Sequence, residues 1–184
     1  RFFVAVFQFP SDPAPGVRYD VLENQLRSIL YNTMQITYQR RFVILFTRGE
    51  GEELGDYVLN MLRTQAEANH LAVGISNAFH GLAEVRRYYQ QALEAIRFGL
   101  RIPKENTYRP LFFYQDYAFI AMLELCRQQT DLMNFCSPML LLLLEHDRKN
   151  DADLMNTLFE YLENAENMQK TAAALYIHKN TLAY

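Results

Sequence analysis

The chain has 184 residues, of which 50% are apolar and 21% charged, and its formal net charge at pH 7 is −3. This composition is that of a globular protein with enough apolar residues for one large or two small domains. The acidic balance excludes a protein that coats nucleic acid regardless of sequence, because such proteins carry a large positive excess.

The cysteines and the length of the apolar runs indicate in which cellular compartment the protein is expected. Cys126 and Cys136 lie in apolar, helix-like surroundings, which predicts two reduced, buried thiols of a cytoplasmic protein and neither a disulfide nor a metal site. The apolar run 139–144 is far shorter than the roughly 20 residues of a membrane span, and no signal-peptide pattern is visible. The chain begins without methionine on strand-like residues, so we expect natural residues upstream of Arg1.

Residues 1–114 alternate between strand and helix patterns. Runs of aromatic and β-branched residues predict strands, and the run 42–46 is apolar throughout, as expected for a strand covered on both faces. A loop rich in proline and glycine is expected at 11–16. The predicted strands are 2–9, two short strands within 35–47 joined near Gln39 and Arg40, 71–76, and 111–114 at an edge of the sheet.

Apolar residues at helical spacing predict three helices between these strands. The third is the most regular, and we expect it to end at Gly99, because glycine is common just after a helix. Its inward residues would be Leu82, Val85, Tyr89, Ala92 or Leu93, and Ile96. The predicted helices span 19–31, 52–69 and 82–99. The order of strands and helices predicts an α+β domain with a mostly antiparallel sheet and helices packed on it.

Residues 115–150 are predicted to form a helical connector. Its last helix would begin at Pro138, because proline suits the first position of a helix. The apolar run 139–144 in that helix is expected to be buried on all sides, and His146–Asn150 to be a polar joint before the last part of the chain. The two earlier helices would span 115–129 and 130–135.

Three short helices are predicted after the connector. Leucines at every fourth residue, preceded by Asp153 as N-cap, predict a first helix that ends near Asn164. The second opens after Asn167, another good N-cap, and contains three alanines at 172–174 that allow a crossing helix to approach closely. The third begins at His178, which we expect to cap it.

Two interpretations of these helices follow from the pattern. A helix held across another by a tight turn, with its first residues exposed, is the geometry that places side chains against base edges in the major groove of DNA. Lys170 and Lys179 are the only charged side chains from Asn167 to the end of the chain, which suits such a role. The alternative is a three-helix packing unit with a solvated polar face.

A resemblance favours the first interpretation. The segments NAENMQKTAAAL and YIHKNTLAY resemble the C-terminal DNA-binding segment of the PucR/CdaR family of bacterial transcription regulators, where a run L-x-I-H-R-N-T-L-x-Y-R-L forms the turn and recognition helix. Lys179 stands where the family has arginine, which keeps the charge but loses the bidentate fork. The chain ends at Tyr184, before the rest of that pattern. The resemblance implies DNA contacts by Gln169, Lys170, Thr171, His178, Lys179, Asn180, Thr181 and Tyr184.

A second resemblance covers the first part of the chain. The segment GISNAFHGLAEVRRYYQQALEAIRFG is similar to a block of the GGDEF-like domain of the same family. Active diguanylate cyclases have a G-G-D/E-E-F hairpin where this chain has YQRRF, so Tyr38 and Gln39 stand for the glycines and Arg40 and Arg41 for the acids. The glycines admit the nucleotide and the acids bind its metal, so the resemblance implies a catalytically inactive relative. The two arginines would be either solvated or in contact with an anion such as a phosphodiester.

The sequence contains no other pattern for catalysis or for a metal. His70, His80, His146 and His178 each lack a second ligand at metal-binding spacing. No nucleophile elbow, phosphate-cradling glycine loop or pair of carboxylates occurs. We therefore expect neither enzymatic activity nor a cofactor.

The resemblances together predict a cytoplasmic, DNA-binding transcription regulator in three parts. These are a GGDEF-like regulatory or dimerisation domain at 1–114, a helical connector at 115–150 and a truncated helix-turn-helix at 151–184. Its partners would be operator DNA, a second copy of the chain, because one such unit reads only a half-site, and a small-molecule effector bound by an upstream domain, without a membrane. The alternative is a nucleotide-sensing or cyclic-dinucleotide-related domain whose C-terminal helices bind protein.

Overall fold

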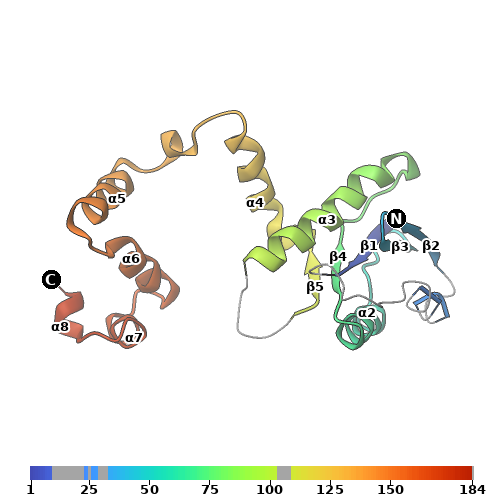
Figure 1. Ribbon diagram of the computed structural model, residues 1–184, viewed down its shortest axis with the longest axis horizontal. Helices are drawn as coiled ribbons and strands as arrows, with labels where there is room; N and C mark the ends of the chain where they lie inside the picture. The colour runs from blue at the N-terminus through green and yellow to red at the C-terminus, as the bar shows by residue number, and fades with distance from the viewer. Residues whose placement is uncertain (10–22, 25, 29–32, 103–108, 184) are drawn as a thin grey trace. The chain divides into compact units, whose positions relative to one another are not determined.

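A computed structural model of the protein describes residues 1–9, 23–24, 26–28, 33–102 and 109–183. The chain forms two compact units, Arg1–Leu125 and Cys126–Tyr184. The first contains a sheet with packed helices, and the described part of the second is helical (Figure 1). This composition confirms the predicted α+β class.

The first unit is built on a five-stranded mixed sheet. Its strands are β1 (Phe2–Gln8), β2 (Met34–Tyr38), β3 (Arg41–Thr47), β4 (Ala72–Ile75) and β5 (Leu111–Phe113). Their order across the sheet is β2-β3-β1-β4-β5. The strand pairs are antiparallel except for β4 and the edge strand β5, which run parallel. The predicted strands and the mostly antiparallel sheet are therefore confirmed.

Helices follow the strands in the predicted order. They are α2 (Asp56–Ala68), the 3-10 turn η1 (Leu82–Glu84), α3 (Val85–Arg101) and α4 (Tyr114–Arg127). Of the predicted helix 19–31, residues 23–24 and 26–28 are described and helical. The predicted loop 11–16 lies outside the described residues.

The central strand β1 is buried on both faces. Its side chains alternate, so that Phe3, Ala5 and Phe7 share one core cluster with residues of α2, while Val4 and Val6 share another with residues of α3. All five are at most 4% exposed. A strand covered in this way has a continuous apolar sequence instead of an alternating one, which explains why this strand was predicted correctly.

Helix α3 differs from its predicted course at both ends. It continues past Gly99, where a Cβ atom would lie 2.0 Å from Cδ1 of Phe112. This glycine is required for the close contact with β5, and it does not end the helix. At the other end, Leu82 and Val85 are 51% and 38% exposed and do not point inward as predicted. The buried face of α3 begins at Ala92, whose small side chain lets the helix approach the sheet.

Helix α2 starts at Asp56, later than the predicted start at 52. The carboxylate of Glu52 accepts a hydrogen bond from the backbone N–H of Gly49 at 3.0 Å and so belongs to a turn. Leu54 has the predicted helical spacing and is buried, but it lies in the segment before the helix and not in the helix itself.

From residue 128 to residue 183, the second unit forms the turn η2 and four helices. These are η2 (Leu132–Phe135), α5 (Pro138–Asn150), α6 (Leu154–Glu163), α7 (Met168–Ala174) and α8 (Lys179–Leu182). Successive helices pack on one another, α5 on α6, α6 on α7 and α7 on α8. Pro138 holds the first position of α5, as predicted. Among the described residues, no helix is long and apolar enough to cross a membrane.

The predicted burial of the connector is wrong. Within the run 139–144, Met139 and Leu142 are 73% and 60% exposed, because α5 packs chiefly on α6 and offers only one side to it. Cys136 is exposed and Cys126 only half-buried, and both thiols are free.

The predicted polar joint is the end of a helix. His146–Asn150 forms the last turn of α5, and the chain changes direction only at Asp151, whose φ of 50° lies in the left-handed region. Asp tolerates this conformation better than most residues do, so the break comes after the charged cluster.

Candidate nucleic-acid interface

The start of α6 is capped by a residue of α5. Asp147 accepts hydrogen bonds from the backbone N–H groups of Met155 at 2.8 Å and Leu154 at 3.0 Å. These bonds, that from Met155 first, lower the pKa of the Asp147 carboxyl below its ordinary value because they favour the charged form. The predicted cap, Asp153, holds the N-cap position but its side chain makes no capping bond. One carboxylate thus ties α5 to α6.

The start of α7 is capped as the sequence predicts. Oδ1 of Asn167 accepts hydrogen bonds from the backbone N–H groups of Gln169 and Lys170 at 3.0 and 3.1 Å. These are two of the donors that the first turn of a helix leaves unpaired. Between α6 and α7, Ala165 and Glu166 have φ values of 51° and 60°, so the connection is a tight turn.

A second tight turn leads from α7 to α8. Tyr176 is left-handed, with a φ of 56°. Its N–H donates to the carbonyl of Ala173 at 3.2 Å, and the N–H of Ile177 donates to that of Ala172 at 2.9 Å. This pair of bonds is the Schellman motif, which ends a helix and satisfies its last carbonyl groups. Ala172 itself is only 4% exposed.

His178 caps α8, as predicted. Its Nδ1 accepts a hydrogen bond from the backbone N–H of Asn180 at 3.2 Å. This N–H is one of the donors that the first turn of a helix leaves unpaired. The cap presents the beginning of α8 as an ordered surface.

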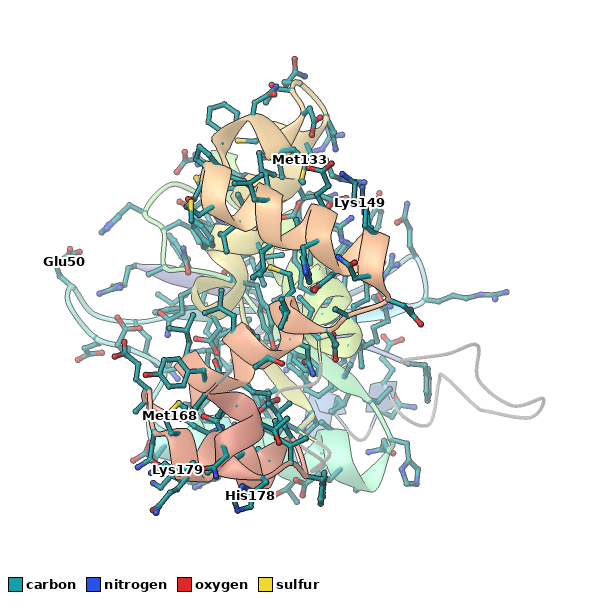
Figure 2. All side chains as sticks on the ribbon, turned by 90° about the vertical axis from the view of Figure 1, so that its left-hand side faces the viewer. Glu50, Met133, Lys149, Met168, His178 and Lys179 are labelled. Carbon is teal, nitrogen blue, oxygen red and sulfur yellow. The ribbon has the colours of Figure 1, made fainter. Side chains whose placement is uncertain are left out.

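Most of the predicted DNA-contacting side chains are exposed. Thr171 departs from this pattern: it is 0% exposed and its hydroxyl donates to the carbonyl of Asn167 at 2.9 Å. Tyr184 lies outside the described residues. His178 and Lys179 project away from the ribbon at the same end of the second unit (Figure 2). The exposed residues are Gln169, Lys170, His178, Lys179, Asn180 and Thr181.

Tyr176 is a candidate that the sequence pattern missed. Its side chain is 95% exposed beside the start of α8, and it is not among the residues predicted to contact DNA. An apolar ring with a hydroxyl group, held out by a left-handed turn, can reach a neighbouring molecule.

The hairpin in the place of the GGDEF motif has a two-residue turn. Gln39 and Arg40 have φ values of 50° and 59°, and Tyr38 pairs with Arg41 in the ladder, which is the geometry of a primed hairpin turn. Arg40 is exposed. Arg41 donates from Nε to Oε1 of Gln8 at 2.6 Å, so this guanidinium is engaged at the end of β1.

The space beside this hairpin is small. The cavity there has a volume of about 20 Å³, against roughly 300–1,000 Å³ for small-molecule sites. Its one carboxylate, Glu23, is held by Thr37 and Arg27, whose hydrogen bonds lower the pKa of Glu23. In the described part of the chain, no three His, Cys, Asp or Glu residues are grouped so that they could hold a metal ion.

Comparison with protein families assigns two segments. Residues 1–98, more than half of the chain, match the GGDEF-like domain, and residues 154–184 match the PucR C-terminal helix-turn-helix domain. This chain belongs to the PucR family of regulators. Helices α6, α7 and α8 are therefore the PucR-type helix-turn-helix, and strands β1 to β4 lie within the GGDEF-like match, whereas β5 follows it.

Three curated relatives come from Bacillus subtilis (strain 168). The DNA-binding transcriptional activator AdeR is 23% identical over 92% of this chain and 42% of its own length. The proline-responsive transcriptional activator PutR is 30% identical over 61% of this chain and 27% of its own length. The purine catabolism regulatory protein is 31% identical over 68% of this chain and 23% of its own length. The chain thus spans less than half the length of each of these PucR-family relatives.

Proposed function

We propose that this PucR-family protein is a DNA-binding transcription regulator that presents the start of α8 to the major groove. The observation that carries the proposal is the capped turn between α7 and α8, which leaves His178, Lys179, Asn180 and Thr181 exposed at the beginning of a helix. Helix-turn-helix proteins bring side chains to base edges in this way. Two of the relatives are named transcriptional activators, which supports the same function.

The exposed side chains divide into two roles. Asn180 and Gln169 are the proposed base-reading residues, because an amide can pair with N6 and N7 of adenine. Lys170 and Lys179 would neutralise phosphates, since neither has an ion-pair partner among the described residues. Thr171 acts in packing, because it is buried. The proposed contact surface is completed by His178, Thr181 and Tyr184.

The proposed organisation has three parts, a regulatory or dimerisation domain at 1–114, a connector at 115–150 and the helix-turn-helix at 151–184. A single helix-turn-helix reads only a half-site, so we infer that two copies bind one operator. The protein would act in the cytoplasm, where bacterial DNA lies, and respond to a small-molecule effector.

The GGDEF-like domain is proposed to lack cyclase activity. Arg40 and Arg41 stand in the positions of the acids that would bind a metal, and guanidinium groups repel Mg²⁺. The cavity of about 20 Å³ beside them also supports this proposal. The small volume of this cavity also argues against a nucleotide-sensing role for the hairpin.

Selection of binding sites from a pool of random duplexes tests the regulator function. The protein is used with any natural residues that flank this chain, and the enriched duplexes are measured by fluorescence anisotropy against scrambled duplexes. We expect a two-fold symmetric sequence bound at least about 10³-fold more tightly than its scrambled control at physiological salt. Equal affinity for all duplexes across a salt series would remove the proposal.

A further inference from the structure

A large cavity lies at the carboxyl ends of the parallel strands β4 and β5, at the end of β1 opposite to the hairpin. Its volume is about 680 Å³, which is within the range of roughly 300–1,000 Å³ found for small-molecule sites. The lining comes from β1, β4, β5 and the beginning of α4, and from α2 with the segment before it. All of these belong to the first unit.

Arg1 supplies the positive charge of this cavity. Its backbone is fixed by Arg48, because the backbone nitrogen of Arg1 donates to the Arg48 carbonyl at 2.8 Å and the Arg48 N–H donates to the Arg1 carbonyl at 2.9 Å. The guanidinium lies over the ring of Phe3, 5.5 Å from the centroid. Its Nε is buried and has no hydrogen-bond partner among the described residues, so the group has donor capacity left.

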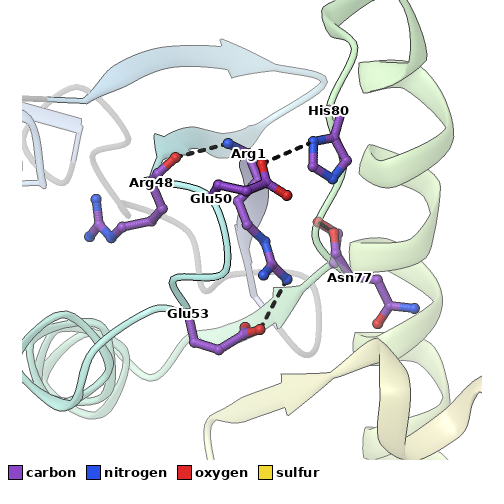
Figure 3. Close-up of polar contacts among 7 residues, drawn as sticks. Arg1, Arg48, Glu50, Glu53, Asn77 and His80 are labelled. Atoms are coloured by element: carbon purple, nitrogen blue, oxygen red, sulfur yellow. Dashed lines mark hydrogen bonds and ion pairs between the residues drawn. The ribbon is translucent and has the colours of Figure 1, made fainter.

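The ion partner of Arg1 can be replaced. Nη2 of Arg1 lies 3.0 Å from Oε1 of Glu53 (Figure 3). The Glu53 side chain is 70% exposed, against 19% for that of Arg1, so solvent and salt weaken the pair and ordering Glu53 costs entropy. An anion inside the cavity would meet the same guanidinium with less water around it. A ligand can therefore displace Glu53.

The rest of the cavity wall combines apolar and polar side chains. The polar ones are Ser76, Asn77, Tyr114 and Gln115. Phe3, Leu59 and Phe113 also line the cavity, and none carries a polar side-chain group. We propose that this cavity binds a small carboxylic acid with a short aliphatic body, its carboxylate on Arg1 and its body against these three side chains. The ligand is either a simple monocarboxylate or an α-amino acid, whose ammonium group would meet Glu53. This site is independent of the proposed DNA contacts.

Isothermal titration calorimetry of the 184-residue chain with three probes tests the proposal. The probes are 4-methylpentanoate, L-leucine and the neutral 4-methylpentanamide. We expect at least one of the two acids to bind with a Kd on the order of 1 mM or tighter, and the amide at least about tenfold more weakly, because it loses the charge-assisted bond to Arg1. Tighter binding of leucine identifies an amino-acid site, and tighter binding of 4-methylpentanoate a monocarboxylate site. No binding of either acid, or equal binding of the amide, overturns the proposal.

Three variants locate the site. Arg1→Gln is expected to weaken the acid by at least about tenfold, whereas Arg63→Gln, on the exposed side of α2, leaves the affinity unchanged. Ala78→Phe keeps Arg1 but fills part of the cavity, and it should abolish binding with little change in the circular dichroism spectrum. If a folded Ala78→Phe variant binds the acid like the unsubstituted chain, the ligand lies elsewhere and the proposal is wrong.

Discussion

Asp147 lies in α5 but caps α6, so we expect the stability of the second unit to depend strongly on this residue. Its two bonds to the start of α6 stabilise the ionised carboxylate and lower its pKa. A group whose pKa is depressed on folding contributes stability that is fully present above its unfolded pKa of about 3.9 and is lost as the pH falls through the folded value.

We predict that Asp147→Asn lowers the free energy of unfolding of the second unit at neutral pH. The variant should also lose less of its stability than the unsubstituted chain when the pH is lowered. Urea unfolding followed by circular dichroism between pH 2 and 7 measures this. The difference between the unsubstituted chain and the variant should be largest near pH 7 and shrink below about pH 4. Glu163→Gln, an exposed change on α6, is the control. A difference that stays constant over this pH range would contradict the capping role.

The residues of the candidate site were predictable where their signal is local. Asn167 and His178 were identified as caps because each lies directly before the helix that it caps. Asp147 was missed because it precedes its helix by several residues and acts across the bend at Asp151. Thr171 was assigned to the surface, although its hydroxyl satisfies a backbone carbonyl inside the unit, which a sequence pattern does not distinguish.

The backbone of Tyr176 is strained, and substitution of this residue can measure the cost of that strain. A non-glycine residue at a φ of 56° brings its Cβ too close to the backbone, at a cost of about 1–2 kcal/mol. We expect Tyr176→Gly to raise the free energy of unfolding of the second unit by about 0.5–1 kcal/mol. Tyr176→Ala, which keeps the Cβ atom, is the control. Equal stability of the two variants in thermal melts would show that the turn is not strained.

At the level of helices, the packing of α7 depends on one small residue. Ala172 is 4% exposed in the turn region, whereas Ala174 is exposed. We predict that Ala172→Leu destabilises the second unit by about 1–3 kcal/mol, because added methylene groups have no room. Ala174→Leu should change stability by less than about 0.5 kcal/mol. Differential scanning calorimetry of both variants tests this prediction. Equal melting temperatures would show that Ala172 is not the tightly packed residue of α7.

Which elements exist was predictable, but where they end and what they bury was less so. The strands of the sheet follow from aromatic and β-branched runs, which suit a buried pleated surface. Gly99 is a glycine, the residue type that often ends helices, but its role here is to allow close contact with Phe112. Phe112 is distant in the sequence, so the pattern of the helix does not reveal this contact. Met139 and Leu142 are apolar yet exposed, because burial depends on neighbours that a pattern within one helix does not reveal.

At the level of the whole chain, a GGDEF-like domain without its acidic motif precedes a PucR-type helix-turn-helix. We predict no cyclic dinucleotide from GTP with Mg²⁺ or Mn²⁺. The double change Arg40→Asp with Arg41→Glu should also give none, because no acid occurs from Arg1 to Ser11 to complete a metal site and the cavity is only about 20 Å³. Liquid chromatography with mass spectrometry measures the product. Dinucleotide above a protein-free blank from either protein would contradict this prediction.

One salt series tests most directly whether the start of α8 reads DNA sequence. Affinities of the unsubstituted protein, Asn180→Ala, Lys170→Ala and the control Asn60→Ala are measured on the selected operator and a scrambled duplex. Asn180→Ala should lose about 1–3 kcal/mol on the operator alone, since it removes a base contact. Lys170→Ala should weaken both duplexes and make the salt slope shallower by about one, since it removes a phosphate contact. If Asn180→Ala weakens the two duplexes equally, α8 does not read the sequence through this residue and the account is wrong.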